Sequence, residues 1–225
     1  MALRQNYCKY FNRQSSADNL RILWRPNMQK WKTLSRTPMF EYNEKLRIER
    51  YEKELPHSRI TFERHEIELP DGLIIANWPW IETADFIEVL AMTTDEKFIC
   101  FRQTKYGLDR ISIAPVGGYI KDDETPVQAA QRELLEETGY QAKEWINLGA
   151  YRVDPNLGIS MGHLFLALSA YHINLPMSDD IEEQQLIFLN QADLTTALSN
   201  GEFKVLGWTA LVALSLAYIN RTSEN

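Results

Sequence analysis

The stretch Gly118–Tyr140 reads GYIKDDETPVQAAQRELLEETGY, and it combines six acidic residues with the signals that begin and end a helix. Thr125 suits the N-cap and Pro126 the first helical position, while Gln128 stands three residues after the cap, where it can complete a capping box. Gly139 suits a left-handed C-cap. The stretch therefore predicts a helix from Pro126 to the residue before Gly139.

This helix should have two unlike faces. Apolar residues recur at the i, i+3, i+7 spacing of a buried stripe, at Val127, Ala130 and Leu134. Carboxylates gather at i, i+3 and i+4 on another face, at Glu133, Glu136 and Glu137. Neighbouring carboxylates destabilise a helix unless a cation compensates, and Arg132 is the only basic residue in the predicted helix. Such a charge run is ordinarily a solvated face, but it also suits Mg²⁺, which takes oxygen ligands and carries phosphorylated substrates.

The spacing resembles the Nudix hydrolase signature, Gly-x5-Glu-x7-Arg-Glu-U-x-Glu-Glu-x-Gly-U, where U is a bulky aliphatic residue. The matching residues are Gly118, Glu124, Arg132, Glu133, Leu134, Glu136, Glu137 and Gly139. Its seven fixed positions would coincide by chance in a chain of this length about once in a million. The final position holds Tyr140 instead of an aliphatic residue, which affects the packing beneath the helix more than the chemistry.

The resemblance covers roughly residues 58–215 and narrows to the ADP-ribose and nucleotide-sugar pyrophosphatase branch. The run Arg102–Gly107, RQTKYG, is similar to one that these enzymes carry before the signature. A preceding antiparallel sheet with a Leu-Pro-Asp-Gly turn serves dimerisation and substrate recognition in that branch. The acidic loop Ser178–Glu183 stands where relatives keep a catalytic carboxylate. Ala114 departs from the pattern, because relatives commonly have a glutamate four residues before the signature glycine.

The resemblance also implies a metal site. It places Mg²⁺, with Mn²⁺ as the alternative, on Glu133, Glu136 and Glu137 and on the backbone carbonyl of Gly117. Ions held there would bridge the substrate diphosphate and activate the water that attacks phosphorus. Glu137 and Arg132 thus count among the catalytic candidates, with Arg132 expected to orient the glutamates and Glu124 to shape the loop. Glu182 is the first candidate for the general base or water-positioning residue, with Glu183 and Asp180 as rivals.

The expected substrate contacts come from two strands. Arg102 and Lys105 are candidate phosphate contacts, but alternation along a strand puts them on opposite faces, so only one of them can face the site. Trp78 and Trp80 are candidates for stacking on an adenine, although aromatic residues in strands are usually core. His163, among apolar neighbours, is expected to be structural rather than a ligand.

Alternating strands and helices indicate an α/β sandwich, and the resemblance specifies a Nudix fold, with a mixed sheet between helices. The expected domains are a basic N-terminal extension and linker at 1–57, a small antiparallel sheet at 58–84 and the Nudix hydrolase domain at 85–225. Within the small sheet a bulge is expected near residues 64–66 and a turn at Pro70–Gly72. Further strands are expected at 86–92, 98–101, 111–113, 146–151, 163–168 and 186–189. Two helices should end the chain, and the last apolar run, Leu206–Ile219, is too short to span a bilayer.

Composition limits the possible partners. The 225 residues are 44% hydrophobic and carry 24 Lys and Arg against 31 Asp and Glu, a net charge of −7. We therefore expect a globular protein with neither nucleic-acid nor membrane partners. Cys8 and Cys100 do not suggest a disulfide framework, which favours a reducing, cytoplasmic location. The first forty residues hold eight basic residues and only Asp18, hence +7, so the remainder carries −14. That basic arm is an ordered extension, a segment that docks on the acidic body, or an organelle-targeting segment.

These inferences predict a homodimeric, Mg-dependent pyrophosphatase that cleaves ADP-ribose or a similar nucleoside diphosphate sugar into a nucleoside monophosphate and a sugar phosphate. Two alternatives remain open at this level. The first is a Nudix hydrolase of another nucleotide class, such as dinucleoside polyphosphates, NADH or a coenzyme. The second is a nucleotide-binding module without catalysis, although such modules typically lose signature glutamates and all of them are present here.

Overall fold

The computed structural model describes residues 30–42, 47–48, 53–54, 60–177 and 183–223. Its centre is an eight-stranded mixed sheet, whose main path runs β10-β12-β6-β7-β13. The strands of that path are β6 Phe86–Thr93, β7 Phe98–Gln103, β10 Tyr140–Gln141, β12 Ile159–His172 and β13 Gln184–Leu189. Three strands pair beside the path: β8 Ser112–Ala114 with β7, β9 Val116–Tyr119 with β6, and β11 Glu144–Asp154 with β12. The β12–β6 pair is parallel and the other pairs are antiparallel.

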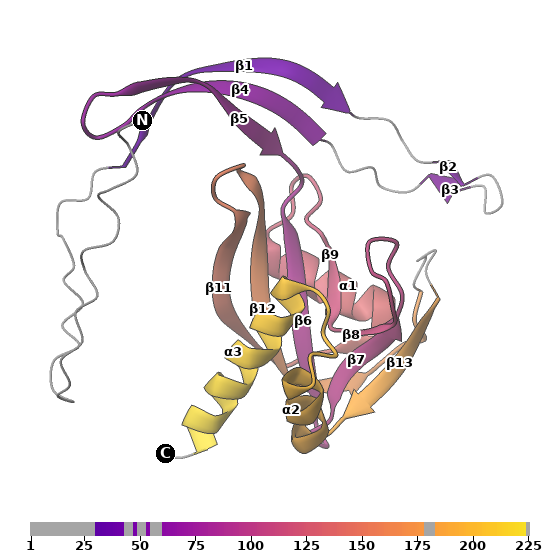
Figure 1. The fold of residues 1–225 in the computed structure, drawn as a ribbon. Helices are drawn as coiled ribbons and strands as arrows, with labels where there is room; N and C mark the ends of the chain where they lie inside the picture. The colour runs from indigo at the N-terminus through magenta and orange to yellow at the C-terminus, as the bar shows by residue number, and fades with distance from the viewer. Residues whose placement is uncertain (1–29, 43–46, 49–52, 55–59, 178–182, 224–225) are drawn as a thin grey trace, which may run out of the picture.

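Helices cover both faces of this sheet (Figure 1). Helix α1, Pro126–Thr138, packs on one face, while α2, Gln191–Ser199, and α3, Leu206–Ser223, pack on the other. Neighbouring residues of β6 therefore join different cores: Val89 packs with the α1 side and Leu90 with the α3 side. The predicted α/β sandwich with a mixed sheet between helices is confirmed.

Helix α1 has the predicted bounds for the predicted local reasons. The backbone N–H of Gln128 donates to the Thr125 side chain, and the Gln128 side chain accepts from the Thr125 N–H, so the capping box is complete. Gly139 ends the helix with φ +76°. The predicted buried stripe was wrong at Val127, which is 36% exposed, whereas Ala129 is fully buried. Ala130 and Leu134, the other two residues of the predicted stripe, are fully buried as expected.

The small sheet has three antiparallel strands in the order β1-β4-β5: β1 Lys32–Tyr42, β4 Ile60–Glu68 and β5 Ile74–Glu82. The expected bulge lies between His65 and Ile67 in the β4–β5 pairing, and the Leu69–Leu73 turn has Gly72 at φ +85°. Strand β1 was not foreseen, since its residues were placed in the basic extension. It pairs with β4 over nearly its full length, so this sheet begins well before the expected boundary at residue 58.

The two sheets are joined through the β11–β12 turn. The small sheet lies across one end of the large one (Figure 1). The backbone N–H of Ile81 donates to the Leu157 carbonyl at 2.8 Å, and Trp78 Nε1 donates to the Asn156 carbonyl at 2.8 Å. Two short strands, β2 Arg47–Ile48 and β3 Lys53–Glu54, pair with each other.

Two short strands of the large sheet precede α1 in the chain. Strand β8 ends at Ala114 and β9 begins at Val116, after which residues 120–125 lead into the helix. Helix α3 packs against the sheet, as predicted for the last apolar run. Within the part of the chain that the structure describes, no helix is both long and apolar enough to cross a membrane.

Candidate active site

Arg132 ties the carboxylates of α1 to the loop that precedes it. Its Nε and Nη2 donate to the two oxygens of Glu124 at 2.8 and 2.9 Å, and its Nη1 donates to Glu133 at 2.5 Å and to Glu136 at 3.1 Å. Nη2 also donates to the Tyr119 carbonyl at 3.1 Å. The hydrogen bonds from Arg132 hold the pKa of Glu124 below its ordinary value. Arg132 therefore links Glu124, Glu133 and Glu136 through hydrogen bonds, while its role in orienting them for catalysis stays a prediction.

Glu133 lies against the signature glycine. A Cβ atom at Gly118 would collide with the Glu133 carboxylate, so glycine leaves the space that this side chain occupies over β9. Burial raises the pKa of Glu133, and the hydrogen bond and charge of Arg132 oppose that rise. A cation that approached this carboxylate would favour its charged form further.

The donor set is chemically suited to a hard divalent ion. Glu133, Glu136 and Glu137 offer carboxylate oxygens from adjacent positions of one helix face, and Gly117 lies on the neighbouring strand β9. Among the described residues, no three acidic, histidine or cysteine side chains already converge as a metal cluster. Arg132 occupies two of the carboxylates instead. The residues thus fit Mg²⁺ by type, while their convergence on an ion requires these side chains to rearrange.

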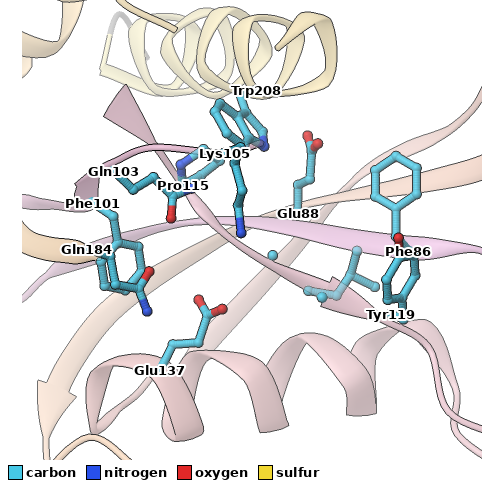
Figure 2. Close-up of a pocket in the computed structure, with 13 residues that line it drawn as sticks. Phe86, Glu88, Phe101, Gln103, Lys105, Pro115, Tyr119, Glu137, Gln184 and Trp208 are labelled. Atoms are coloured by element: carbon cyan, nitrogen blue, oxygen red, sulfur yellow. The ribbon is translucent and has the colours of Figure 1, made fainter. Parts of the chain in front are cut away.

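A cavity of about 230 Å³ lies beside this helix and extends to the opposite side of the sheet (Figure 2). Its polar lining consists of Glu88, Gln103, Lys105, Glu137 and Gln184. Figure 2 shows Glu137 extending into the cavity from α1 and Lys105 extending toward it from the other side. Trp208 of α3 stands at the far end. The cavity therefore joins a signature glutamate to the RQTKYG run.

Two residues of that run line the cavity: Gln103, the last residue of β7, and Lys105, two positions beyond the strand. Gln103 is buried and lines the cavity with Lys105, whereas Arg102 is exposed on the other face and lines neither cavity described here. Of the two candidate phosphate contacts, the structure thus brings only Lys105 together with Glu137. Ala114, the departure from the family pattern, is fully buried in the core on the α3 side.

The two candidate tryptophans lie away from this cavity. Trp80 stacks on His65 with ring centroids 5.0 Å apart, and it lines a second cavity of about 770 Å³ between the two sheets. His163 lines the second cavity too, together with Arg36 and Arg152. Trp78 packs edge-on against Trp31 at 5.7 Å and lines neither cavity. Trp80 therefore lines a cavity and Trp78 lines neither of the two, and stacking on an adenine stays a prediction for both.

The candidate general bases are placed only in part. Asp180 and Glu182 lie outside the residues that the structure describes. Glu183 is exposed at the start of β13, and the next residue, Gln184, lines the cavity. The assignment of the base among these carboxylates stays a prediction.

Three polar residues of the cavity were not among the candidates from the sequence: Gln103, Gln184 and Glu88, of which only Glu88 is ionisable. Glu88 is only 4% exposed, and its Oε2 has no hydrogen-bond partner among the described residues. Burial raises the pKa of its carboxyl to about 7. Glu88 lies directly opposite Gly117 in the β6–β9 pairing. A single charged residue in the apolar run FIEVLAM was the signal that could have indicated it.

Comparisons with known proteins identify the family of this chain. The NUDIX domain family model matches residues 86–209, more than half of the chain. The ADP-ribose pyrophosphatase of Bacillus subtilis (strain 168) is 30% identical over 135 residues, which cover 59% of this chain and 70% of that protein. The methanol dehydrogenase activator of Bacillus methanolicus is 28% identical over 81 residues, which cover 36% of this chain and 44% of that protein.

A solved structure, described as the crystal structure of an ADP compounds hydrolase, has the same fold. It matches with a TM-score of 0.66 and 18% identity, and the match covers 87% of this chain and 97% of that chain. At 18% identity, this similarity shows a shared fold and nothing about function. The family match spans the signature helix, the cavity strands and most of the large sheet, so this chain belongs to the Nudix family and is a Nudix hydrolase related to ADP-ribose pyrophosphatase.

Proposed function

We propose that this protein is a Mg²⁺-dependent pyrophosphatase that cleaves the diphosphate linkage of ADP-ribose or a similar nucleoside diphosphate sugar. The products would be a nucleoside monophosphate and a sugar phosphate. The observation that carries the proposal is the cavity in which Glu137 of the signature helix and Lys105 face the same space. The relationship to an ADP-ribose pyrophosphatase supports the choice of substrate class.

The residues have separate tasks in this reaction. Glu133, Glu136 and Glu137, with the Gly117 carbonyl, would hold Mg²⁺, which neutralises diphosphate charge and activates water when bound, with Mn²⁺ as the alternative. Lys105 supplies a positive charge for a phosphate oxygen. Water attacks one phosphorus in line, the bond from that phosphorus to the bridging oxygen breaks, and the bridging oxygen leaves with the other phosphate.

The proton of the attacking water goes to a carboxylate of the loop after β12. Glu182 is the first choice for this acceptor, with Glu183 and Asp180 as rivals. Arg132 acts through the glutamates and touches no substrate in this scheme, because its donors are already directed to Glu124, Glu133 and Glu136. Trp80 is kept as a candidate for contact with the base, since it lines the larger cavity.

We also propose a homodimer in the cytoplasm, with the small sheet as the dimerisation element. Phe40 of β1 and Phe62 of β4 are directly opposite each other in the pairing and are 57% and 42% exposed. An exposed pair of this size, on a sheet that covers only one end of the Nudix fold, suits a contact with a second copy.

The first experiment measures AMP release from ADP-ribose by the purified protein with Mg²⁺, beside GDP-mannose, ADP-glucose, NADH and diadenosine polyphosphates. Glu137→Gln should lower kcat on the order of 10²-fold or more, because it removes one carboxylate from the metal site. The exposed Glu144→Gln is the matched control and should keep wild-type activity. Removal of Mg²⁺ with EDTA should abolish turnover.

Two results would contradict this proposal in different ways. Cleavage of another panel member with ADP-ribose left intact would overturn the substrate while leaving the hydrolase mechanism in place. Retention of full turnover by Glu137→Gln would remove this residue from the catalytic machinery.

A further inference from the structure

Glu88 is a buried carboxylate that has no role in the proposed reaction. Its side chain is 96% buried, lines the 230 Å³ cavity, and leaves Oε2 without a hydrogen-bond partner among the described residues. A buried polar atom without a partner destabilises the folded state, and more so when it is charged. Buried carboxylates in folded proteins are therefore ordinarily paired with a donor.

The first turn of α3 holds this carboxylate in place. A Cβ atom at Gly207 would lie 2.5 Å from Glu88 Oε1 and 2.8 Å from Oε2, so the carboxylate lies directly against the first turn of α3. The positive end of the helix dipole makes a carboxylate tolerable here. This purely structural role would explain why the charge is accepted, but it supplies no donor for Oε2.

The two ends of the cavity differ in charge. Lys105 and Glu137 extend into one end, and Figure 2 shows the Glu88 carboxylate pointing away from them toward α3 and Trp208. Phosphate oxygens are attracted to Lys105 and repelled by a carboxylate, so the part of a nucleotide sugar that meets Glu88 should be a hydrogen-bond donor without negative charge. Sugar hydroxyls are such donors, and two adjacent hydroxyls can address both oxygens of one carboxylate.

The size of the cavity restricts the choice further. Pockets that enclose drug-sized ligands are about 300–1,000 Å³, so 230 Å³ accommodates one ring of a nucleotide sugar rather than a nucleoside with its base. The Trp208 ring offers an apolar wall for the C–H face of that ring.

We propose that the cavity end formed by Glu88 and Trp208 binds the sugar on the far side of the diphosphate from the nucleoside, with adjacent sugar hydroxyls donating to the Glu88 carboxylate. This inference rests on the proposed function, because it assigns the diphosphate to the Lys105 and Glu137 end. It makes Glu88 a specificity-determining residue, since a buried acceptor left unpaired penalises substrates that lack the donor.

The activity test compares ADP-ribose with an ADP ester in which a pentyl chain replaces the sugar. The wild-type protein should prefer ADP-ribose by about 10²-fold or more in kcat/KM. In Glu88→Leu that preference should fall at least about tenfold, mainly through a higher KM for ADP-ribose. Glu88→Gln keeps the shape and one acceptor oxygen, so it should give an intermediate preference even if the leucine variant folds poorly. Glu144→Gln should behave as the wild type.

A binding test separates this inference from the proposed function. The protein is titrated calorimetrically with ribose 5-phosphate in the presence of Mg²⁺. Glu88→Leu should bind it with a Kd at least about tenfold weaker than the wild type and Glu144→Gln. If ADP-ribose is hydrolysed but its preference survives in Glu88→Leu, the sugar site is overturned and the proposed function stands. If ADP-ribose is not hydrolysed, the proposed function fails. In that case the ribose 5-phosphate titration alone tests the sugar site. Weaker binding by Glu88→Leu than by the wild type supports the site, and equal binding or no binding overturns it.

Discussion

Neighbouring side chains of β7 point to opposite faces of the sheet, and this decides which of them line the cavity. Gln103 faces the cavity, Arg102 faces solvent one position earlier, and Cys100 enters the core on the α3 side. Successive side chains of a strand point to opposite faces, so a shift by one residue would exchange the two sets. The register of β7 thus keeps Arg102 out of the cavity, and Lys105 is the one of the two candidate phosphate contacts that lines it.

Cys100 should be unreactive while the protein is folded. Burial raises the pKa of its thiol to about 12, so its thiolate fraction at pH 8 is on the order of one in ten thousand. In a Cys8→Ala background, a disulfide reagent such as DTNB should label Cys100 at least about 10³ times more slowly in buffer than in urea. Equal labelling rates in the two solvents would show that the thiol is accessible in the native fold.

At the scale of elements, α1 depends on the backbone that packs against its C-terminal end. The carbonyl of Gly139 accepts from the N–H groups of Ile173 and Asn174 at 2.9 and 3.2 Å, which brings the end of β12 against the cap. This contact anchors the C-terminal end of the helix, and with it Glu137, two residues before the cap. A helix cap and a neighbouring segment thus position one catalytic candidate together.

Two glycines with the same backbone conformation make it possible to measure how much the contact at the end of α1 contributes to stability. Gly139 and Gly201 have φ of +76° and +65°, but a Cβ would strike the Asn174 carbonyl at the first and meets open space at the second. Gly201→Ala should cost about 1–2 kcal/mol from left-handed strain alone. Gly139→Ala should cost about 2 kcal/mol more, since backbone must move. Urea unfolding measures both, and equal losses would mean that the contact with Asn174 is not limiting.

At the scale of the whole molecule, the chain builds two sheets with different exposures. The large sheet is covered by helices on both faces, whereas the small one exposes Phe40 and Phe62. Part of the basic arm belongs to the small sheet, where Lys32 pairs with Glu68 at 3.5 Å and Arg36 with Glu82 at 3.7 Å. Exposed pairs of this kind contribute little stability, so the pairing of β1 with β4 is the main attachment.

The proposed homodimer gives a prediction at this scale. Phe40→Glu should convert the dimer to a monomer, because it places a charge in the exposed apolar pair. Leu175→Glu changes a residue that is 75% exposed outside the small sheet and should leave the mass unchanged. Sedimentation velocity measures both masses. A monomeric wild-type protein, or a dimer that persists in Phe40→Glu, would contradict this assignment of the interface.

The sequence alone determined the features that depend on local interactions. Helix α1, its capping box, its C-cap and the Leu69–Leu73 turn were predictable, because each is set by residues a few positions apart. The family resemblance then indicated that the mixed sheet lies between helices. Strand β1 was not predictable in this way, because a strand in a charged arm is stabilised by its partner β4, which follows it by about twenty residues.

Tertiary structure alone decided which side chains share the cavity. Lys105 reaches it while Arg102 does not, and Trp80 lines the other cavity instead. Glu88 joins Glu137 and Trp208 although they lie on three elements far apart in the chain. Side-chain spacing within one element follows from its period, but the approach of β6, α1 and α3 follows from packing across the whole core. The sequence therefore determined the catalytic helix, and the packing of the core determined what faces it.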